Sequence, residues 1–360
     1  MYDEDKRAPI LLSGDNLYSF LDALKKDKIK YFQFYNTEFE SSEYSFIKYM
    51  TTFKDNPKPK KLNKTYYDIE TFVNENGDFT DPGKVIEEIN AIAFYNNIAN
   101  TVYGVAYVHP DCKIESYDQV IRDVKKIINE KVKENPIYEV EGLTIEVLLF
   151  NNEKDMLKKF FELLHSFNTL TLCGYNNRIF DDPYLFNRMS VLFGEDNMKN
   201  IVSEFGEIEK FGQGSFELPD FILVDILELY KPVGQGGGGL GKSLSSYKLN
   251  YVAKKELSIT KLDLEGGFRE NYLNNLPGYI AYNIFDTILT FKLDNKLQFL
   301  ELNFDLGQYN RSPMGPVLQG RSFLYMYRND ITYVSQNKLV RNKKFSSDVV
   351  YEPNIPKNML

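Results

Sequence analysis

The sequence of 360 residues contains no tryptophan and only two cysteines and two histidines. Cys112 and Cys173 are too few for a disulfide framework, and together with His109 and His165 they cannot form a zinc site made of cysteine and histidine. Any metal ion bound by this chain is therefore expected to be held by oxygen atoms.

The sequence also lacks a long apolar run. No stretch approaches the roughly 20 apolar residues that span a membrane, and the first residues, MYDEDKRAPI, are charged where a signal peptide would be apolar. A net charge of −8 argues against binding nucleic acid through overall charge, and 43 % hydrophobic residues exclude wholesale disorder. We therefore expect a soluble, cytoplasmic protein without a membrane partner.

The order of the apolar patterns predicts an α/β fold. A connector rich in Lys and Pro at 54–64 separates an N-terminal region, 1–64, from three strand-like runs, TYYDIETFV, EINAIAFYNN and TVYGVAYVH. The spacing then predicts a helix over 153–167, a buried strand in LTLCGYN, a strand-like run in FILVDILELY, a helix in SLSSYKLNYVAKKEL that starts with Ser, and a long helix over 277–297. Such alternation is typical of a sheet with helices packed on it.

Two acidic residues, Asp68 and Glu70, form the first candidate site. They are two positions apart in a predicted strand, so both side chains project from the same face. Like charges held this close repel one another unless a cation joins them. An isolated Asp-x-Glu pair is more often a solvent-exposed strand face, and this motif alone decides little.

A second cluster, GYNNRIFDDPYLFNR, follows a predicted buried strand, and sites in α/β sheets assemble at strand ends. The alternative is a capped helix start, with Asp181 or Asp182 as the N-cap and Pro183 at the first helical position. That alternative accounts for Asp182 and Pro183 and leaves Asn176 and Asp181 unexplained.

A third pair, Tyr282 and Asp286, lies four residues apart on one face of the predicted long helix. A lone pair of this kind is usually part of a helix surface. The order and spacing of all three groups together carry more information than any one of them.

The three groups resemble the motifs of the 3′→5′ proofreading exonuclease domain of family B DNA polymerases, particularly the phage replicative type. That family carries Asp-x-Glu on a first strand, then Asn and [Phe/Tyr]-Asp, then Tyr-x(3)-Asp; here they read DIE at 68–70, NNRIFD at 176–181 and YNIFD at 282–286. The resemblance implies an RNase H-like exonuclease domain over 65–295, a mixed sheet flanked by helices. It also implies a smaller α+β N-terminal domain over 1–64 and a segment, 296–360, that returns to it and leads to a palm.

The residue types indicate the chemistry. Four carboxylates suit the hard cations Mg²⁺ or Mn²⁺, and a two-metal centre can hydrolyse a phosphodiester. By resemblance, Asp68 bridges both ions, Glu70 and Asp181 complete their coordination, and Asp286 binds the ion that carries the nucleophile. Tyr282 matches the family tyrosine that orients the attacking water.

The resemblance also suggests DNA contacts. Asn176 and Phe180 match positions that contact the terminal nucleotide, and an aromatic ring can stack on an unpaired base. Thr71 and Phe72 resemble further substrate contacts, although they are equally well explained as ordinary strand residues. Lys261 lies where a family lysine approaches the scissile phosphate.

Three other features have less specific interpretations. The segment GGGGLGKS at 236–243 fits the phosphate-loop pattern, but Lys231-Pro232 and a longer glycine run interrupt the strand-to-helix junction that such a loop needs, so we interpret it as a loop. The segment EIEKFGQGSFELPDF predicts a hairpin, either a DNA contact or a plain surface hairpin. Asp225 is interpreted as a residue that supports the carboxylate set or has a structural role.

The palm motifs of a family B polymerase, Asp-x(2)-Ser-Leu-Tyr-Pro-Ser and Asp-Thr-Asp, do not occur in these residues. We therefore expect a metal-dependent 3′→5′ proofreading exonuclease that acts on DNA and pairs with a separate polymerase chain, in the host cytoplasm if the source is a phage. The sequence is compatible with two origins of this chain, a naturally split polymerase subunit and an expressed fragment of a longer polymerase. The alternatives in function are a non-catalytic, DNA-binding scaffold and a free-standing exonuclease.

Overall fold

The computed structural model describes residues 62–73, 81–211, 215–232, 241–259, 264 and 266–310. A six-stranded sheet in the order β4-β3-β2-β1-β5-β8 organises this part of the chain. The strands are β1 (Lys64–Thr71), β2 (Ile89–Asn96), β3 (Thr101–Tyr107), β4 (Thr144–Phe150), β5 (Thr171–Gly174) and β8 (Ile222–Asp225). The pairs β1–β2 and β2–β3 are antiparallel, whereas β3–β4, β1–β5 and β5–β8 are parallel. The sheet is therefore mixed, as predicted.

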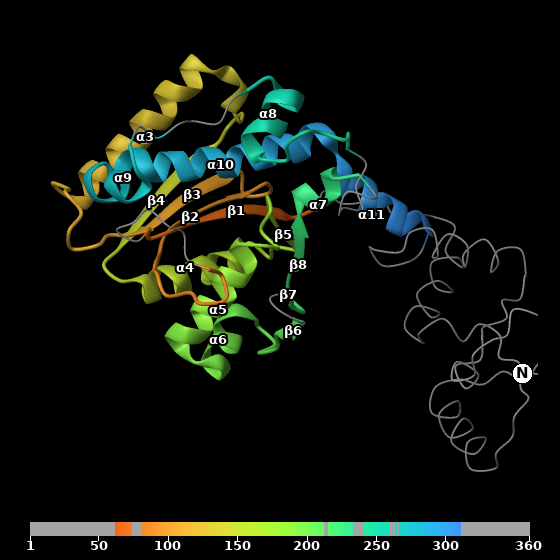
Figure 1. The fold of residues 1–360 in the computed structure, drawn as a ribbon, viewed down its shortest axis with the longest axis horizontal. Helices are drawn as coiled ribbons and strands as arrows, with labels where there is room; N and C mark the ends of the chain where they lie inside the picture. Colours follow the sequence, from red (N-terminus) through yellow and green to blue (C-terminus); the bar gives the residue numbers. More distant parts are fainter. Residues whose placement is uncertain are drawn as a thin grey trace, which may run out of the picture. The chain divides into compact units, whose positions relative to one another are not determined.

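Helices cover both faces of the sheet (Figure 1). On one face, α10 (Leu276–Leu297) packs across β1, β2 and β3, with α3 (Tyr117–Glu134), α8 (Leu249–Leu257) and α9 (Phe268–Asn274) beside it. On the other face, α4 (Glu153–Ser166) packs on β2, β3 and β4, and α5 (Asp181–Phe193) packs on β1. The helix α6 (Glu195–Val202) lies beside α4 and α5. The predicted arrangement of helices on a central sheet is confirmed.

The alternation of side chains along β1 gives its two faces different surroundings. Tyr67 and Ile69 belong to the apolar core that also contains Phe94 and Phe160. Because neighbouring residues in a strand point to opposite faces, Asp68 and Glu70 project toward the side that α10 covers. The helix that carries Tyr282 and Asp286 is thus placed over the strand that carries the first acidic pair.

A row of small residues lets α10 approach the sheet closely. The register places Ala93 opposite Asp68 and Gly104 opposite Ala93, so these three residues share one face across β1, β2 and β3. A Cβ atom at Gly104 would lie 2.7 Å from methyl groups of both Ile280 and Ile284 on α10. The row Asp68–Ala93–Gly104 therefore determines how near α10 lies to the sheet.

Most of the predicted elements are confirmed, and three details are wrong. The run FILVDILELY is a strand only to Asp225, and Ile226–Tyr230 forms the short helix α7, because the Asp225 side chain accepts a hydrogen bond from the N–H of Leu227 at 2.9 Å and caps the helix. The serines at the start of SLSSYKLNYVAKKEL precede the helix, since α8 begins only at Leu249.

The third difference concerns α5. Phe180 occupies the N-cap position, Asp181 is the first helical residue, and Pro183 is the third, so neither aspartate is the N-cap. Asp181 therefore does not use its carboxylate to cap the helix start.

The remaining elements lie around this sheet or follow it. The strands β6 (Glu209–Phe211) and β7 (Ser215–Glu217) pair antiparallel, as the hairpin prediction requires. A 3₁₀ turn, η1 (Pro136–Tyr138), follows α3, and α11 (Phe299–Asn310) follows α10. Residues 236–240 of GGGGLGKS lie outside the described residues, so its loop interpretation stays a prediction; the described residues 241–248 contain no helix.

The predicted division at 64 and 295 stays a prediction, because residues 1–61 and 311–360 lie outside the described residues. Residues 59–302 form one compact unit. Across the parts of the chain that the structure describes, no helix combines the length and the apolar character needed to cross a bilayer.

Candidate active site

One cleft collects the acidic residues of all three motifs. Asp68 and Glu70 come from β1, Asp181 from the first turn of α5, and Tyr282 and Asp286 from α10. Asn176, Phe180, Ile69 and Phe268 complete its lining. Asp68, Glu70 and Asp286 each place a carboxylate oxygen within 4.8 Å of the others. Residues separated by more than 200 positions in the sequence therefore converge at one point.

The carboxylate of Asp181 is held against β1. It is 7 % exposed, and its Oδ1 accepts a hydrogen bond from the backbone N–H of Ile69 at 3.2 Å. Burial, and after it the neighbouring Asp68 carboxylate, raise the pKa of Asp181 well above its ordinary value. This electrostatic situation is the one that a bound cation relieves, because a positive charge stabilises both carboxylates.

The adjacent Asp182 has a different environment. It is buried, accepts a hydrogen bond from the Tyr67 hydroxyl, and accepts another from Asn177 Nδ2 at 3.0 Å. Burial raises the pKa of Asp182 to about 6, although both hydrogen bonds act in the opposite direction. Asp182 therefore anchors the start of α5 under the sheet and leaves Asp181 at the cleft.

The loop that carries Asn176 is held by Asp225. Asn176 has a positive φ of 64°, and its backbone N–H donates to Asp225 Oδ1 at 2.9 Å. The same Asp225 oxygen caps α7 through Leu227. Asp225 is absent from the cleft lining and joins the ends of β5 and β8, which agrees with the structural interpretation made from the sequence.

The other predicted DNA contacts are placed differently. Phe180 lines the cleft and stacks on Tyr184, with ring centroids 5.5 Å apart. Thr71 and Phe72 are not among the lining residues, and Phe72 lies between the guanidinium of Arg269, at 4.4 Å, and the ring of His109, at 5.7 Å. Lys261 lies outside the described residues. The contacts of all four with DNA stay predictions.

Sequence reasoning missed two residues at this site. Phe268, at the start of α9, lines the cleft and meets the Tyr282 ring edge-on, with centroids 5.8 Å apart. It carries no motif signal. Asn283, inside the motif YNIFD, donates from Nδ2 to Asp68 Oδ2 at 2.7 Å. Its position next to Tyr282 was the signal that could have identified it.

The cleft suits hard divalent cations. Four carboxylates line it, and neither histidine nor cysteine does. Mg²⁺ and Mn²⁺ prefer oxygen ligands of this kind. Asp68, Glu70, Asp181 and Asp286 are therefore the residues that could hold such ions.

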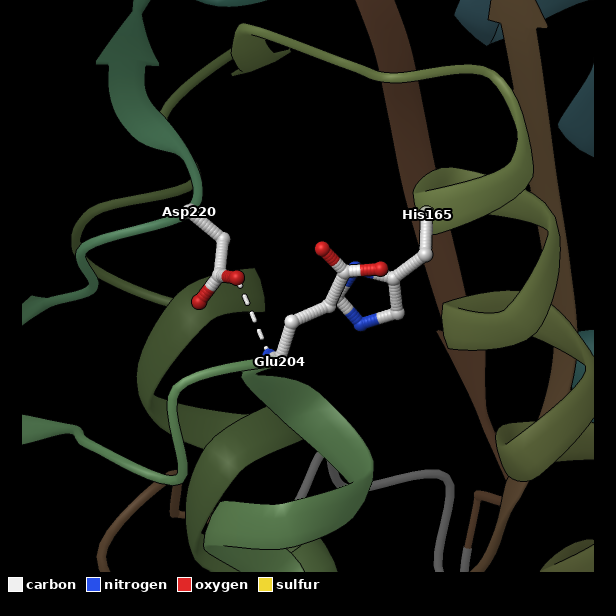
Figure 2. Close-up of side chains that lie close together, drawn as sticks. All are labelled: His165, Glu204 and Asp220. Atoms are coloured by element: carbon white, nitrogen blue, oxygen red, sulfur yellow. Dashed lines mark hydrogen bonds between the residues drawn. The ribbon is translucent and has the colours of Figure 1, made fainter.

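A second group of possible metal ligands lies away from this cleft. His165, Glu204 and Asp220 each place one ligand atom within 4.8 Å of the others. Figure 2 shows the Asp220 carboxylate accepting a hydrogen bond from the backbone N–H of Glu204, at 3.0 Å. Glu204 is exposed, and the His165 ring stacks on Phe221 with centroids 5.1 Å apart. These contacts therefore have a structural explanation. They join the turn after α6 to the segment before β8.

The mixed sheet, with a carboxylate cleft between β1, α5 and α10, defines the RNase H-like class to which polymerase-associated exonuclease domains belong. Residues 23–252 match the family described as "DNA polymerase family B, exonuclease domain". The chain therefore belongs to the family B DNA polymerases, and the matched part is their exonuclease domain. The resemblance and the fold class predicted from the sequence are confirmed.

Curated relatives agree with this family. The chain is 27 % identical over 259 residues to the DNA-directed DNA polymerase of Escherichia phage RB69, covering 69 % of this chain and 27 % of that protein. It is 27 % identical over 249 residues to the DNA-directed DNA polymerase of Enterobacteria phage T4, covering 67 % and 26 %. A DNA polymerase delta catalytic subunit from Plasmodium falciparum is 28 % identical over 240 residues, covering 58 % and 20 %. The chain thus spans about a quarter of the length of the two phage polymerases it matches.

Proposed function

We propose that this chain is a metal-dependent 3′→5′ exonuclease that removes mismatched nucleotides from the 3′ end of DNA. The observation that carries the proposal is the convergence of Asp68, Glu70, Asp181 and Asp286, with Tyr282, in one cleft. Carboxylates grouped in this way can hold the divalent ions that catalyse phosphodiester hydrolysis. Membership of the exonuclease domain family supports the same reaction.

The residues of the cleft have separate tasks in this proposal. The four carboxylates hold two divalent ions, Mg²⁺ or Mn²⁺, and such ions, when bound, supply activation of water and stabilisation of the departing 3′ oxygen. Tyr282 on α10, a residue that is 7 % exposed, orients the attacking water through a hydrogen bond of its phenol. Asn176 and Phe180 hold the terminal nucleotide at the rim, the first through its amide and the second by stacking.

The first test removes single carboxylates. With Mg²⁺ or Mn²⁺, the purified chain should shorten single-stranded DNA labelled at its 5′ end, giving a ladder of products that lose nucleotides from the 3′ end. Asp68→Ala and Asp286→Ala should abolish the ladder, and chelation by EDTA should do the same. Glu195→Ala, an exposed acid on α6, is the matched control. Full activity in either cleft variant would show that the catalytic assignment is wrong.

The second test separates catalysis from binding. Tyr282→Phe removes one hydroxyl, so the turnover rate should fall while the affinity for single-stranded DNA stays near that of the unmodified chain. Single-turnover cleavage and a fluorescence anisotropy titration measure the two quantities. An equal loss of both would mean that the tyrosine maintains the structure of the site.

We further propose that a polymerase chain with palm, fingers and thumb is the partner, since the matched family is the exonuclease domain of DNA polymerases and the phage relatives are DNA-directed DNA polymerases. Co-purification from the native source should recover such a polymerase chain together with the exonuclease. Recovery of an active exonuclease alone would favour a free-standing enzyme, and recovery of the complex without nuclease activity would favour a DNA-binding scaffold.

A further inference from the structure

Asn283 connects α10 directly to the first acidic residue of the cleft. Its side chain is 1 % exposed, and its Nδ2 donates to Asp68 Oδ2 at 2.7 Å and to the Asp68 backbone oxygen at 3.3 Å. Both atoms that face this nitrogen are acceptors, so the amide must present its NH₂ group to Asp68. One side chain thus holds the carboxylate and the main chain of the same residue.

This contact limits two degrees of freedom at once. The bond to the carboxylate restricts rotation of the Asp68 side chain, and the bond to the backbone oxygen fixes the local separation of α10 and β1. Asp286 lies one turn further along the same helix, so its distance from Asp68 depends on that separation. Asn283 therefore acts on the relation between two of the four carboxylates.

The chemical character of the amide also suits this position. A neutral donor orients a carboxylate without cancelling its negative charge, whereas a lysine or arginine at this place would compete with a divalent cation for it. A carboxylic side chain would add repulsion. Asparagine donates a hydrogen bond to the Asp68 carboxylate and adds neither a positive nor a negative charge beside it.

We propose that Asn283 is a positioning residue that holds Asp68 in the orientation needed to bind a divalent cation. This inference rests on the proposed function, and it assigns to Asn283 a task that the Tyr-x(3)-Asp motif does not include. Residues that orient metal ligands typically change metal affinity or activity by about 10- to 100-fold when they are replaced. We expect an effect of that size on the affinity for Mn²⁺.

The test compares two Asn283 variants with a matched control. Asn283→Leu keeps the volume of the side chain and removes the donor, and Asn283→Ala removes both. Thr287→Val is the control, because Thr287 is equally buried one turn along the same helix and its hydroxyl donates to the backbone oxygens of Ala93 and Asn283, both at 3.2 Å, instead of to Asp68. All three variants remove a buried hydrogen bond between α10 and the sheet.

Mn²⁺ binding to the full chain without DNA is the first measurement, made by electron paramagnetic resonance of the free ion. Both Asn283 variants should raise the dissociation constant for Mn²⁺ about 10- to 100-fold, and Thr287→Val should leave it within about twofold. The melting temperatures of Asn283→Leu and Thr287→Val serve to show that each variant is folded. In DNA cleavage, high Mn²⁺ should partly restore the rate of the Asn283 variants, with the KM for DNA unchanged.

Equal Mn²⁺ affinity in folded Asn283→Leu and in the unmodified chain would overturn the inference, and so would an equal loss in Thr287→Val. Absence of Mn²⁺ binding by the unmodified chain would overturn it as well. If the unmodified chain binds Mn²⁺ but does not degrade DNA, the proposed function fails, and the Mn²⁺ titration still decides the role of Asn283.

Discussion

The two faces of the central sheet differ around the cleft, although the α10 face also buries aromatic rings further along the helix, where Tyr66 and Tyr95 pack on Phe291. On the α4 and α5 face, large rings interlock: Phe94 stacks on Tyr103 with centroids 4.9 Å apart and meets Phe160 edge-on at 5.1 Å. On the α10 face, the row Asp68–Ala93–Gly104 offers almost no side-chain bulk, and buried Asn283 and Thr287 make hydrogen bonds to the sheet. Both faces bury apolar area, and next to the cleft the α10 face also sets the distance between α10 and β1.

This difference separates stability from activity. Burial of apolar area is non-directional and roughly proportional to the area, so the aromatic face can stabilise the fold without fixing any one atom. Hydrogen bonds and close backbone approach depend on direction and distance, so the α10 face can fix the carboxylates of β1 and α10 relative to each other. Substitutions on the two faces should therefore have different consequences.

The largest expected effect on stability comes from the aromatic face. Phe160→Ala removes a completely buried ring that contacts both Phe94 and Tyr67, and it should lower the free energy of unfolding by about 3–5 kcal/mol. Urea denaturation measures this loss. Exonuclease activity per folded molecule, assayed well below the melting temperature, should stay close to that of the unmodified chain; a large loss there would show that the two faces are not separable.

Substitution of Gly104 is expected to lower stability less than Phe160→Ala does, and to lower activity more. Gly104→Val introduces bulk where a Cβ already meets Ile280 and Ile284, which should destabilise the protein by about 1–3 kcal/mol and displace α10. A displacement near 1 Å of reacting groups reduces rates about a hundredfold. Single-turnover cleavage measures the rate.

Val105→Ala is the control for Gly104→Val, because Val105 is the next residue along β3 and faces the aromatic core instead of α10. It should lower stability with little change in the cleavage rate of the folded protein. Similar rates for the two variants would argue against a role of the small-residue row in placing α10.

The smallest effect is expected at Thr287. Thr287→Val removes one buried hydrogen bond to Ala93 and keeps the side-chain volume, so it should lower the free energy of unfolding by about 0.5–1.5 kcal/mol. The cleavage rate should stay close to that of the unmodified chain, because the Thr287 hydroxyl donates to the backbone oxygens of Ala93 and Asn283 and not to a cleft carboxylate. A rate loss comparable with that of Gly104→Val would mean that any contact of α10 with the sheet controls the site.

Much of this arrangement could be predicted from the sequence, because the acidic residues stand in motifs with fixed spacing and the apolar periods are long. Residues of all three motifs line one cleft, and their roles stay predictions. The roles of Gly104 and Ala93 could not be predicted, since they depend on strand register, which becomes visible only when β1, β2 and β3 are paired.

Other contacts also depend on tertiary structure. Phe268 lines the cleft because α9 packs against α10 and places its first residue on the Tyr282 ring, and no spacing in the sequence indicates this. The break of FILVDILELY into a strand and a helix depends on Asp225, whose carboxylate accepts hydrogen bonds from two separate segments. Local propensity favoured a continuous strand there, and a side-chain cap overrode it.

The adjacent aspartates at the start of α5 give a rule for engineering a nuclease-deficient form of this chain. Asp181→Ala removes a carboxylate from the cleft, relieves the repulsion with Asp68 and leaves one donor, the Ile69 N–H at 3.2 Å, without its acceptor, so the variant should lose less stability than Asp182→Ala. Asp182→Ala would leave the Tyr67 hydroxyl and the Asn177 amide without their acceptor beneath the sheet, and loss of activity would then report loss of structure. An inactive variant meant to trap DNA should therefore carry the substitution at position 181 and keep the aspartate at 182.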